Sequence, residues 1–467
     1  MSKILLVNSY LLSNDLNEQR VMKPYAPLGI QYISSYLKSK GHHVDIFDGT
    51  FSSIPKFRTT LEKLKPKAVG IYANVITKET ALQMSALTKS TSGGHTAVLV
   101  GGPGPVLDID AYFASGVDVI VRGEGELTVE ALLNLNNLSD STQLHQIDGI
   151  IFKKDGRIVR TKDRKLIEDL DTIPFPDRES INIQDYMNAW KGRHGVSSIQ
   201  ILTARGCPYT CTWCSKEVFG SIYRKRKIEK VIEEMQLIKE KYNPDQLWIA
   251  DDILTLKRDW ILEFSSKVKE KNIAIPFECL ARVDLVDEEV LAALKSIKCF
   301  RIWYGSESGS QRVLDSMKKN FTVEDIFRAG RLTKEAGIEI GFFIMIGYPG
   351  EEVRDIEKTI DMLKRLEPDY CGSAVAFPIK GTEFYKSVES KIITQLEWKQ
   401  RNENRLAFKG RYPNIFYWFA IRLINNILPW QNLLKDKRKN ITKFVTTFIK
   451  ILICKTGMFI TGHQFSK

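Results

Sequence analysis

The segment Ala204-Arg-Gly-Cys-Pro-Tyr-Thr-Cys-Thr-Trp-Cys-Ser215 places Cys207, Cys211 and Cys214 in a C-x-x-x-C-x-x-C pattern. Three thiolates this close in sequence can fold around one iron–sulfur cube, whose four irons are normally held by four cysteines. Because only three cysteines are offered, one iron would stay open to bind a small molecule. The spacing also differs from those of ferredoxin electron carriers. The pattern therefore predicts a 4Fe–4S cluster with one open iron.

Two other interpretations of these cysteines stay open. They are three unrelated cysteines, or they form part of a zinc site, which would need a fourth cysteine or histidine nearby. The nearest histidine before the segment is His194, and none follows until His463. The absence of a neighbouring fourth ligand favours the cluster.

Length and cysteine usage indicate a multidomain protein of a reducing compartment. A chain of 467 residues suggests two or three domains with ample core. The other four cysteines are scattered through apolar runs and form no disulfide framework, which favours a cytoplasmic protein. They are Cys279, Cys299, Cys371 and Cys454. The stretch from Met1 to Asn8 is too short and too quickly polar for a signal peptide.

The first part of the chain alternates expected strands with helices. Strands are expected at 3–8, 43–48, 68–72, 97–102 and 117–121, with helices near 27–40 and 78–91. This alternation predicts a parallel α/β sheet, whose ligands bind at the C-terminal strand ends. Those ends carry Pro27-Leu28-Gly29, Gly101-Gly102-Pro103-Gly104 and Gly123-Glu124-Gly125-Glu126. Glycines allow a backbone to approach a large flat or phosphate-bearing ligand closely, although any Rossmann-like domain has such turns.

A second series of strands and helices follows a hairpin at 149–160 and a polar stretch, 163–197, interpreted as a linker. Strands are expected at 198–204, 246–251, 275–281, 299–305, 339–346 and 372–378. Six strand–helix units predict an incomplete (β/α) barrel of the TIM type, with its chemistry at the C-terminal strand ends. The predicted domains are 1–140, 141–197 (hairpin and linker), 198–390 (barrel) and 391–467 (tail).

Two sets of residues carry a resemblance to a known family. C-x-x-x-C-x-aromatic-C, with Trp213 at the aromatic position, resembles the signature of the radical S-adenosylmethionine superfamily. The order P-L-G before a helix, G-H-x-V-x-I-x-D, V-G-I, G-G-P and G-E-G-E resembles the cobalamin-binding domain that precedes many of its barrels. The resemblance covers roughly residues 1–390. It implies three cofactors: a 4Fe–4S cluster on the three cysteines, S-adenosylmethionine and cobalamin.

The resemblance also implies which residues contact the two organic cofactors. For S-adenosylmethionine these are Trp213, Asp251, Asp252, Arg282, Gly305, Glu307, Gly309 and Gly347. A carboxylate suits the cofactor's ammonium group and a guanidinium its carboxylate. The alternatives are helix N-caps for the aspartates, a structural salt bridge for Arg282 and a plain turn at Gly305–Gly309. For cobalamin the implied residues are Pro27, Gly29, Gly101, Gly102, Gly123, Glu124 and Gly125.

One departure from the family pattern concerns cobalt. Cobalamin domains that supply a histidine ligand carry D-x-H-x-x-G, but Asp48-Gly49 is not followed by that motif. His42 and His43 instead precede a strand, where surface positions are expected. We therefore expect cobalamin to bind without a protein histidine on cobalt.

The resemblance implies a C-methyltransferase. In that scheme a 5′-deoxyadenosyl radical removes hydrogen from an unactivated carbon of a lipid, tetrapyrrole or natural product, and methylcobalamin supplies the methyl group. The alternatives are an oxidative cyclase or rearrangement enzyme, as in the family's anaerobic porphyrin-ring cyclases, and a non-catalytic iron–sulfur or corrinoid carrier. No acid–base catalytic residue is expected. The expected partners are a small-molecule or lipid substrate and an electron donor such as flavodoxin or ferredoxin.

The tail differs in composition from the rest of the chain. Residues 404–467 hold twelve Lys or Arg and one acid, Asp436, so they carry +11 of the net +12. The charge lies in one tail and the body is nearly neutral, so no nucleic-acid partner is expected. Neither 408–430 nor 441–460 gives eighteen uninterrupted apolar residues, so no membrane span is expected. A basic helical tail can lie on an anionic membrane, or it can cap the barrel.

Overall fold

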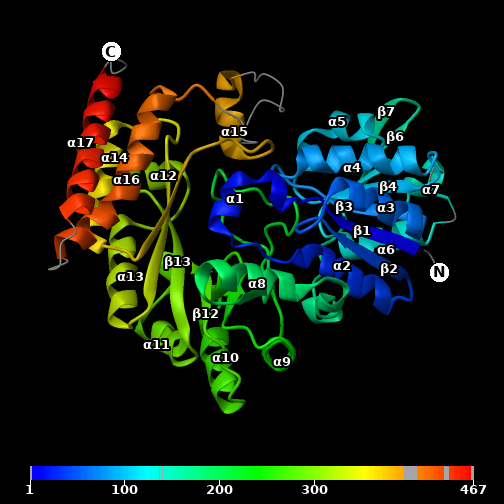
Figure 1. Ribbon diagram of the computed structural model, residues 1–467, viewed down its shortest axis with the longest axis horizontal. Helices are drawn as coiled ribbons and strands as arrows, with labels where there is room; N and C mark the ends of the chain where they lie inside the picture. Colours follow the sequence, from blue (N-terminus) through cyan, green and yellow to red (C-terminus); the bar gives the residue numbers. More distant parts are fainter. Residues whose placement is uncertain (1–2, 136, 139, 394–407, 436–440, 464–467) are drawn as a thin grey trace. The chain divides into compact units, whose positions relative to one another are not determined.

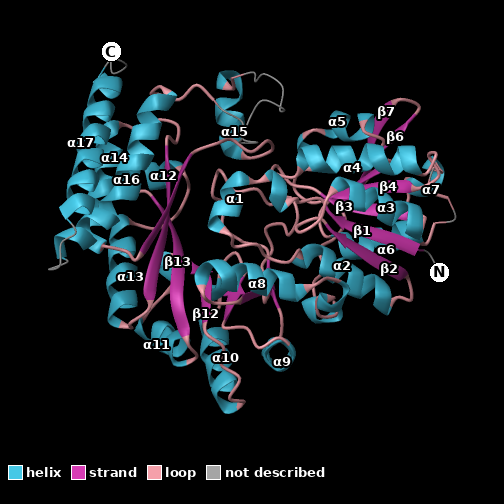
Figure 2. Cartoon of the chain, in the orientation of Figure 1, coloured by secondary structure: helices cyan, strands magenta, loops and turns pink. Residues whose placement is uncertain are grey.

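The computed structural model describes residues 3–135, 137–138, 140–393, 408–435 and 441–463. It is a mixed α/β structure whose described residues form two large sheets, one two-stranded sheet, covering helices and two C-terminal helices (Figures 1 and 2). By internal contacts the described residues form two compact units. The first comprises 3–208 and 215–247, and the second comprises 209–214, 248–393 and the C-terminal helices. Each unit is described separately.

The first unit is built on a seven-stranded sheet in the order β2-β1-β3-β4-β5-β6-β7. Its strands are β1 (Lys3–Asn8), β2 (His43–Asp48), β3 (Ala68–Tyr72), β4 (Ala97–Gly101), β5 (Val119–Val121), β6 (Ile150–Lys154) and β7 (Arg157–Arg160). The first five are parallel, so their C-terminal ends share one edge. All three predicted glycine-rich turns lie at that edge.

Helices cover both faces of this sheet. They are α1 (Leu16–Val21), α2 (Leu28–Ser39), α3 (Ile54–Leu64), α4 (Lys78–Thr91), α5 (Ile109–Ala114), α6 (Gly125–Leu133) and α7 (Ser141–Leu144). The run Ile4 to Val7 of β1 is buried on both faces, as expected for a central parallel strand. Ile4 and Leu6 belong to one hydrophobic core, and Leu5 and Val7 to another.

The structure differs from the sequence prediction in two places, the hairpin before the expected linker and the linker itself. The hairpin β6–β7 pairs antiparallel with β5, so it extends the first sheet rather than standing apart from it. The expected linker contains the helix α8 (Ile183–His194). Tyr186, Met187 and Trp190 are buried on one face of it. Their helical spacing was present in the sequence but lay among polar residues and prolines.

The second sheet contains six strands in the order β15-β14-β13-β12-β11-β8. These strands are β8 (Ser198–Ile201), β11 (Gln246–Ile249), β12 (Phe277–Ala281), β13 (Cys299–Glu307), β14 (Glu339–Ile346) and β15 (Tyr370–Val375). The strands follow one another in sequence order, with helices between them. The predicted partial (β/α) barrel is confirmed.

Helices connect and follow the strands of the second sheet. They are α9 (Ile228–Lys241), α10 (Arg258–Glu270), α11 (Glu288–Ser296), α12 (Gln311–Ser316), α13 (Val323–Glu335), α14 (Val353–Leu366) and α15 (Glu383–Val388). A short antiparallel pair was not expected: β9 (Ala204–Arg205) lies against β10 (Arg224–Lys225). This pair brackets residues 206–223, which we call the cysteine segment.

Two helices, α16 (Asn414–Lys435) and α17 (Ile441–His463), end the described chain. α16 buries Phe416, Ala420 and Ile424 completely and packs on α14 and β15, so it is a cap of the second unit (Figure 1). α17 packs on α16. By length and composition alone, Thr442–Gly462 is long and apolar enough to cross a membrane, with a mean hydropathy of 1.5. Only 17% of its most apolar 18-residue stretch is buried. This result departs from the sequence expectation of no span, which required uninterrupted apolar residues.

Candidate functional site

The cysteine segment begins shortly after β8, at the C-terminal end of the first barrel strand. Cys207, Cys211 and Cys214 form no disulfide bond and lie at half-buried positions. The amide of Cys214 donates a hydrogen bond to the carbonyl of Cys211 at 3.2 Å, which makes the C-x-x-C half a turn. The backbone there therefore presents two thiols from one turn.

Three of the other four thiols have a raised pKa. Burial raises the pKa of Cys371 to about 12 and also raises that of Cys454. The hydrogen bond with Cys299, and then burial, raise the pKa of Cys279. Metal ligands are thiolates, so these raised pKa values disfavour Cys279, Cys371 and Cys454 as ligands.

Within the described ranges, no group of three His, Cys, Asp or Glu side chains converges as a single metal ion requires. A four-iron cube does not require such convergence, since each thiolate binds a different iron. The three thiols therefore fit a cluster as a donor set.

Trp213 lies between the last two cysteines and packs against an apolar group. The group is Val313, Met317, Tyr348, Ala376, Phe384 and Val388. Neighbouring Thr212 fixes the backbone, because its amide donates to the Met317 carbonyl at 3.1 Å and its hydroxyl lies 2.6 Å from the Tyr348 hydroxyl. The indole Nε1–H of Trp213 is buried without a hydrogen-bond partner. A buried orphan donor at this position fits a bound polar ligand.

The predicted charged residues are at the barrel strand ends, and most are buried. Asp251, two residues after β11, is fully buried, whereas Asp252 is exposed. Glu307 ends β13, is 4% exposed and has a left-handed backbone, with φ of 60°. A glutamate in this conformation is strained, and such strain is concentrated at functional sites.

Arg282 follows β12 and is engaged in internal contacts. Its Nε and Nη2 donate to the two carboxylate oxygens of Asp284, each at 3.0 Å, and Nη2 also donates to the Lys319 carbonyl at 2.7 Å. Its guanidinium lies 3.5 Å from the ring centroid of Tyr209. This is the structural salt bridge that the sequence left as an alternative. Arg282 therefore also holds Tyr209 of the cysteine segment.

Lys319 is a buried cation that the sequence analysis missed. Its ammonium lies 3.3 Å from Glu307 Oε1 and 6.0 Å from the ring centroid of Trp213. Its neighbours Lys318 and Asn320 both have φ of 55°, a reversed backbone that turns the intervening side chain inward. In the sequence it is the second lysine of a pair, which is typical of a surface.

The three predicted barrel glycines differ in their surroundings. A Cβ at Gly305 would meet Glu307 Oε1 at 3.0 Å and Lys319 Nζ at 3.3 Å, so this glycine faces the charged group. A Cβ at Gly309 would instead meet the Lys358 carbonyl at 2.6 Å, so Gly309 allows α14 to approach. Gly347 has φ of 81°, and its amide donates to the Glu351 carboxylate.

The glycine edge of the first sheet is formed mainly by backbone. Gly102 has φ of 103°, and a Cβ there would meet the Ala73 carbonyl at 2.5 Å. Gly123 has φ of 71°. The other predicted positions are less constrained: Pro27 is the N-cap of α2, Gly29 has open space around its Cβ position, and Gly101 makes ordinary contacts. A Cβ at Gly125 would meet the side chain of Ile33 at 2.7 Å.

A polar group at the same edge was not found from the sequence. Asn8 Nδ2 donates to Asp48 Oδ1 at 3.0 Å, and the Tyr186 hydroxyl donates to Asp48 Oδ2 at 2.6 Å. Burial, and then the charge of Asp48, raise the pKa of Tyr186. His43 starts β2 and so lies at the opposite, N-terminal edge of the parallel strands.

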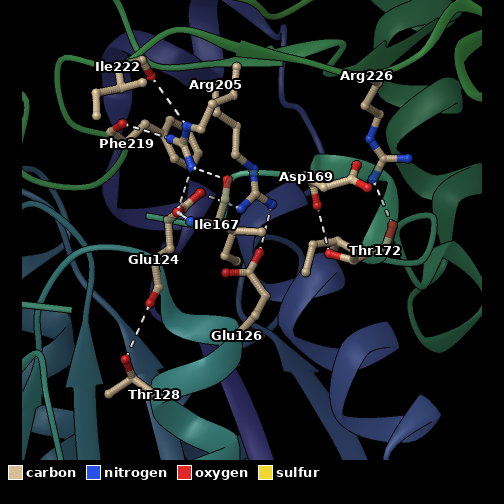
Figure 3. A network of polar contacts seen from close by, with 12 residues as sticks. Glu124, Glu126, Thr128, Ile167, Asp169, Thr172, Arg205, Phe219, Ile222 and Arg226 are labelled. Carbon is tan, nitrogen blue, oxygen red and sulfur yellow. Dashed lines mark hydrogen bonds and ion pairs between the residues drawn. The ribbon is translucent and has the colours of Figure 1, made fainter. Parts of the chain in front are cut away.

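Glu124 has a different environment from the one predicted. Figure 3 shows its carboxylate with Arg205, which also binds Glu126. The Arg205 nitrogens donate to Glu124 at 2.9 Å and to Glu126 at 2.7 Å, and all three side chains are buried. Burial lowers the pKa of Arg205, but the two carboxylates outweigh it and raise that pKa. The Glu124 side chain is therefore engaged within the protein, and its predicted contact with cobalamin stays a prediction.

Comparisons with known proteins agree with this geometry. The Radical SAM superfamily model matches residues 201–363, and the B12 binding domain model matches residues 20–133. An uncharacterized methyltransferase of Pyrococcus horikoshii is 30% identical over 384 residues, covering 80% of this chain and 81% of that protein. The anaerobic magnesium-protoporphyrin IX monomethyl ester cyclase of Rubrivivax gelatinosus is 27% identical over 380 residues, covering 79% and 67%.

A solved structure shares the whole fold. The cobalamin-dependent S-adenosylmethionine radical enzyme OxsB, with aqua-cobalamin and S-adenosylmethionine bound, superimposes with a TM-score of 0.76 at 17% identity. The match covers 98% of this chain and 72% of that one. The chain therefore belongs to the radical S-adenosylmethionine enzymes that carry a B12-binding domain.

Proposed function

We propose that this enzyme is a cobalamin-dependent C-methyltransferase that acts on an unactivated carbon of a small molecule or lipid. One observation carries the proposal. The same chain has a segment with three cysteines on a partial barrel and a parallel sheet with glycine-rich turns that matches the B12 binding domain model. The relative from Pyrococcus horikoshii, itself named a methyltransferase, supports the choice of reaction. When bound, the cofactors supply a one-electron cleavage of the sulfonium and a transferable methyl group.

Cys207, Cys211 and Cys214 would hold the cluster. Asp251 and Lys319 are the buried anion and cation with which the ammonium and carboxylate of S-adenosylmethionine would pair. Trp213 would offer its free indole N–H, and Gly305 would let the backbone pass close to the cofactor. Glu307 would bind a hydroxyl group while keeping Lys319 in place.

The glycine edge of the first sheet would hold cobalamin. Gly102 and Gly123 give a backbone with little side-chain bulk, which suits the flat face of a corrin ring. The parallel strands direct their C-terminal ends to this edge, where ligands of such sheets bind. No histidine is proposed on cobalt, since His43 begins its strand at the other edge.

An oxidative cyclase is the second candidate. The relative from Rubrivivax gelatinosus, named a magnesium-protoporphyrin ester cyclase, favours it. Both reactions would use the same barrel, and they differ in the mass of the product. Anaerobic incubation of reconstituted enzyme with S-adenosylmethionine, a reductant and cell extract separates them. A product heavier by one methylene, formed with S-adenosylhomocysteine, supports methyl transfer. A product lighter by two hydrogens supports the cyclase and would overturn our first choice.

We also propose that α17 rests on an anionic membrane surface. Its exposed face carries large apolar side chains at helical spacing, with Val445, Phe448, Leu452 and Phe459 between 46% and 65% exposed. Lys443, Lys450 and Lys455 lie on the same helix, so α17 as a whole combines exposed apolar area with positive charge. The sequence left a barrel cap and membrane contact as alternatives for the tail. Here α16 is the cap, and α17 is proposed to contact the membrane.

Vesicle sedimentation tests this surface. The variant Leu452→Glu with Phe459→Glu adds charge only at exposed positions, so folding should be retained. Wild type should bind anionic vesicles at low salt and leave them at high salt, since each basic residue near the surface contributes about 1 kcal/mol. The double variant should stay in solution. Equal binding of the two proteins, or no binding of wild type, would contradict the proposal.

A further inference from the structure

The cysteine segment is closed at its base by the pairing of β9 with β10. Arg205 pairs with Arg224 in this antiparallel register, and Lys225 pairs with Ala204. The chain therefore enters the segment at one arginine and leaves it at the other. Gly206 follows Arg205 with φ of 83°, and a Cβ there would overlap the carbonyl oxygen of Ile222. The two arms of the segment are in close contact at this point.

Two buried arginines from opposite ends of the segment meet on one carboxylate. Arg205 Nη1 donates to Glu124 Oε1 at 2.9 Å, and Arg224 Nη1 donates to Glu124 Oε2 at 2.7 Å. Each oxygen of Glu124 thus binds a different end of the segment. The three side chains are between 3% and 5% exposed, so solvent does not screen the pairs.

The second arginine also fixes the returning arm. Arg224 donates to the carbonyls of Phe219 at 2.8 Å, Ile222 at 3.3 Å and Ile167 at 2.8 Å. The amide of Ile167 in turn donates to Glu124 Oε2 at 2.8 Å. The backbone around the carboxylate is therefore held by charge-assisted hydrogen bonds.

Charge is balanced within the group. Glu126, in the first turn of α6, accepts from Arg205 Nη2 at 2.7 Å, so two carboxylates face two guanidinium groups. Arg205 also lies 5.1 Å from the ring centroids of Tyr32 and Phe219. Loss of Glu124 would leave both guanidinium groups with only one buried counter-charge.

We propose that Glu124 is a positioning residue for the iron–sulfur cluster, acting through Arg205 and Arg224 to hold the two ends of the cysteine segment together. Cys207 lies two residues from Arg205, so the position of its thiol depends on this base. The inference rests on the proposed function because it presupposes the cluster. It assigns Glu124 a role in the cluster site, beyond its predicted place at the cobalamin edge.

The test compares Glu124→Gln with Glu130→Gln in the full, anaerobically reconstituted chain. Glu130 lies on α6, whose N-cap is Glu124, and accepts from the Tyr36 hydroxyl at 2.7 Å, a partner outside the cysteine segment. Glu124→Gln should lose iron to a chelator about tenfold faster than wild type or more, because a buried charge pair is broken. Glu130→Gln should lose iron at the wild-type rate.

A second readout separates positioning from a loss of general stability. Glu124→Gln leaves one unbalanced positive charge near Cys207, so the midpoint potential of the cluster should move to a more positive value. A purely structural role would lower the melting temperature without moving the potential. If Glu124→Gln cannot be obtained folded, Arg224→Lys replaces it for iron release, since it keeps the charge and loses the hydrogen-bonding fork.

The outcomes are distinct. Faster iron loss and a shifted potential in Glu124→Gln, or faster iron loss in Arg224→Lys where that variant is used, with Glu130→Gln unchanged, support the inference. Iron loss at the rate of the Glu130→Gln control, or an unmoved potential, overturns it. If wild type itself binds no four-iron cluster, the proposed function fails instead, which is a separate result.

Discussion

Different chemical groups line the C-terminal edges of the two sheets. At the edge of the first sheet, Gly102 and Gly123 have left-handed backbones, and the charged side chain of Glu124 is already bound by Arg205 and Arg224 within the protein. The barrel edge carries buried charged side chains, including Asp251, Glu307 and Lys319. A backbone edge suits a large ligand recognised by shape, whereas buried charges suit a small zwitterion. The comparison indicates why one chain would hold both cobalamin and S-adenosylmethionine.

The largest expected effect concerns the thiols at the barrel edge. Replacing Cys207, Cys211 and Cys214 together with Ala should abolish iron binding and the visible absorbance of the cluster, because these three thiolates are its proposed ligands. Iron analysis after anaerobic reconstitution measures this. The matched control is Cys371→Ala, which should keep full iron content. A triple variant that retains its iron would refute the cluster assignment.

The next effect concerns the buried cation. Lys319→Met should weaken binding of S-adenosylmethionine roughly ten- to a hundredfold, since a hydrogen bond to a charged group contributes about 1.5–3 kcal/mol. Equilibrium dialysis with cluster-loaded protein measures the affinity. The control is Lys318→Met, whose side chain is 48% exposed and binds the exposed Glu383. Equal affinities in the two variants would show that Lys319 has only a structural role.

Two adjacent glycines test whether the backbone at the C-terminal edge of the first sheet shapes the cobalamin site. Gly102→Ala should lower stability by about 1–3 kcal/mol and weaken cobalamin binding, because its φ of 103° and the nearby Ala73 carbonyl oppose a Cβ. Gly101→Ala should be tolerated, since its Cβ would meet Val121 only at 3.7 Å. Thermal melts and hydroxocobalamin titration measure both. If Gly102→Ala binds cobalamin as Gly101→Ala does, the backbone at Gly102 does not shape the site.

The two sheet edges also differ in how much of each could be predicted from the sequence. Glycine turns and clustered cysteines are local patterns, so their places at strand ends were predictable. The partners of Glu124 were not, because Arg205 and Arg224 lie about 80 and 100 residues away and meet it only through the fold. Lys319 was missed because its inward direction depends on the left-handed backbone of its two neighbours.

The helix α8 was missed for another reason. Its apolar residues Tyr186, Met187 and Trp190 have helical spacing, but prolines and acids before them indicated a linker. The helix α17 was predicted from the sequence. Only the structure showed that its apolar side chains are exposed, whereas those of α16 are buried.

The last expected effect is a pH dependence at the barrel edge. Burial raises the pKa of Glu351 from 4.5 to about 8 in the folded chain. Its contribution to stability is therefore fully present below the unfolded pKa and is lost as the pH rises towards 8. Glu351→Gln should gain stability relative to wild type between pH 5.5 and 8.5, by melting temperature. The exposed control Glu357→Gln should show no such trend, and parallel curves for Glu351→Gln and wild type would contradict the assignment.

The most direct test of the central claim follows the methyl group itself. Reconstituted enzyme is incubated anaerobically with S-adenosylmethionine carrying a deuterated methyl group, reductant, cobalamin and cell extract, and small molecules and lipids are analysed by mass spectrometry. We predict a product that carries the deuterated methyl, formed together with both 5′-deoxyadenosine and S-adenosylhomocysteine. Cleavage to 5′-deoxyadenosine alone, with no labelled product and no S-adenosylhomocysteine, would contradict a cobalamin-dependent methyltransferase.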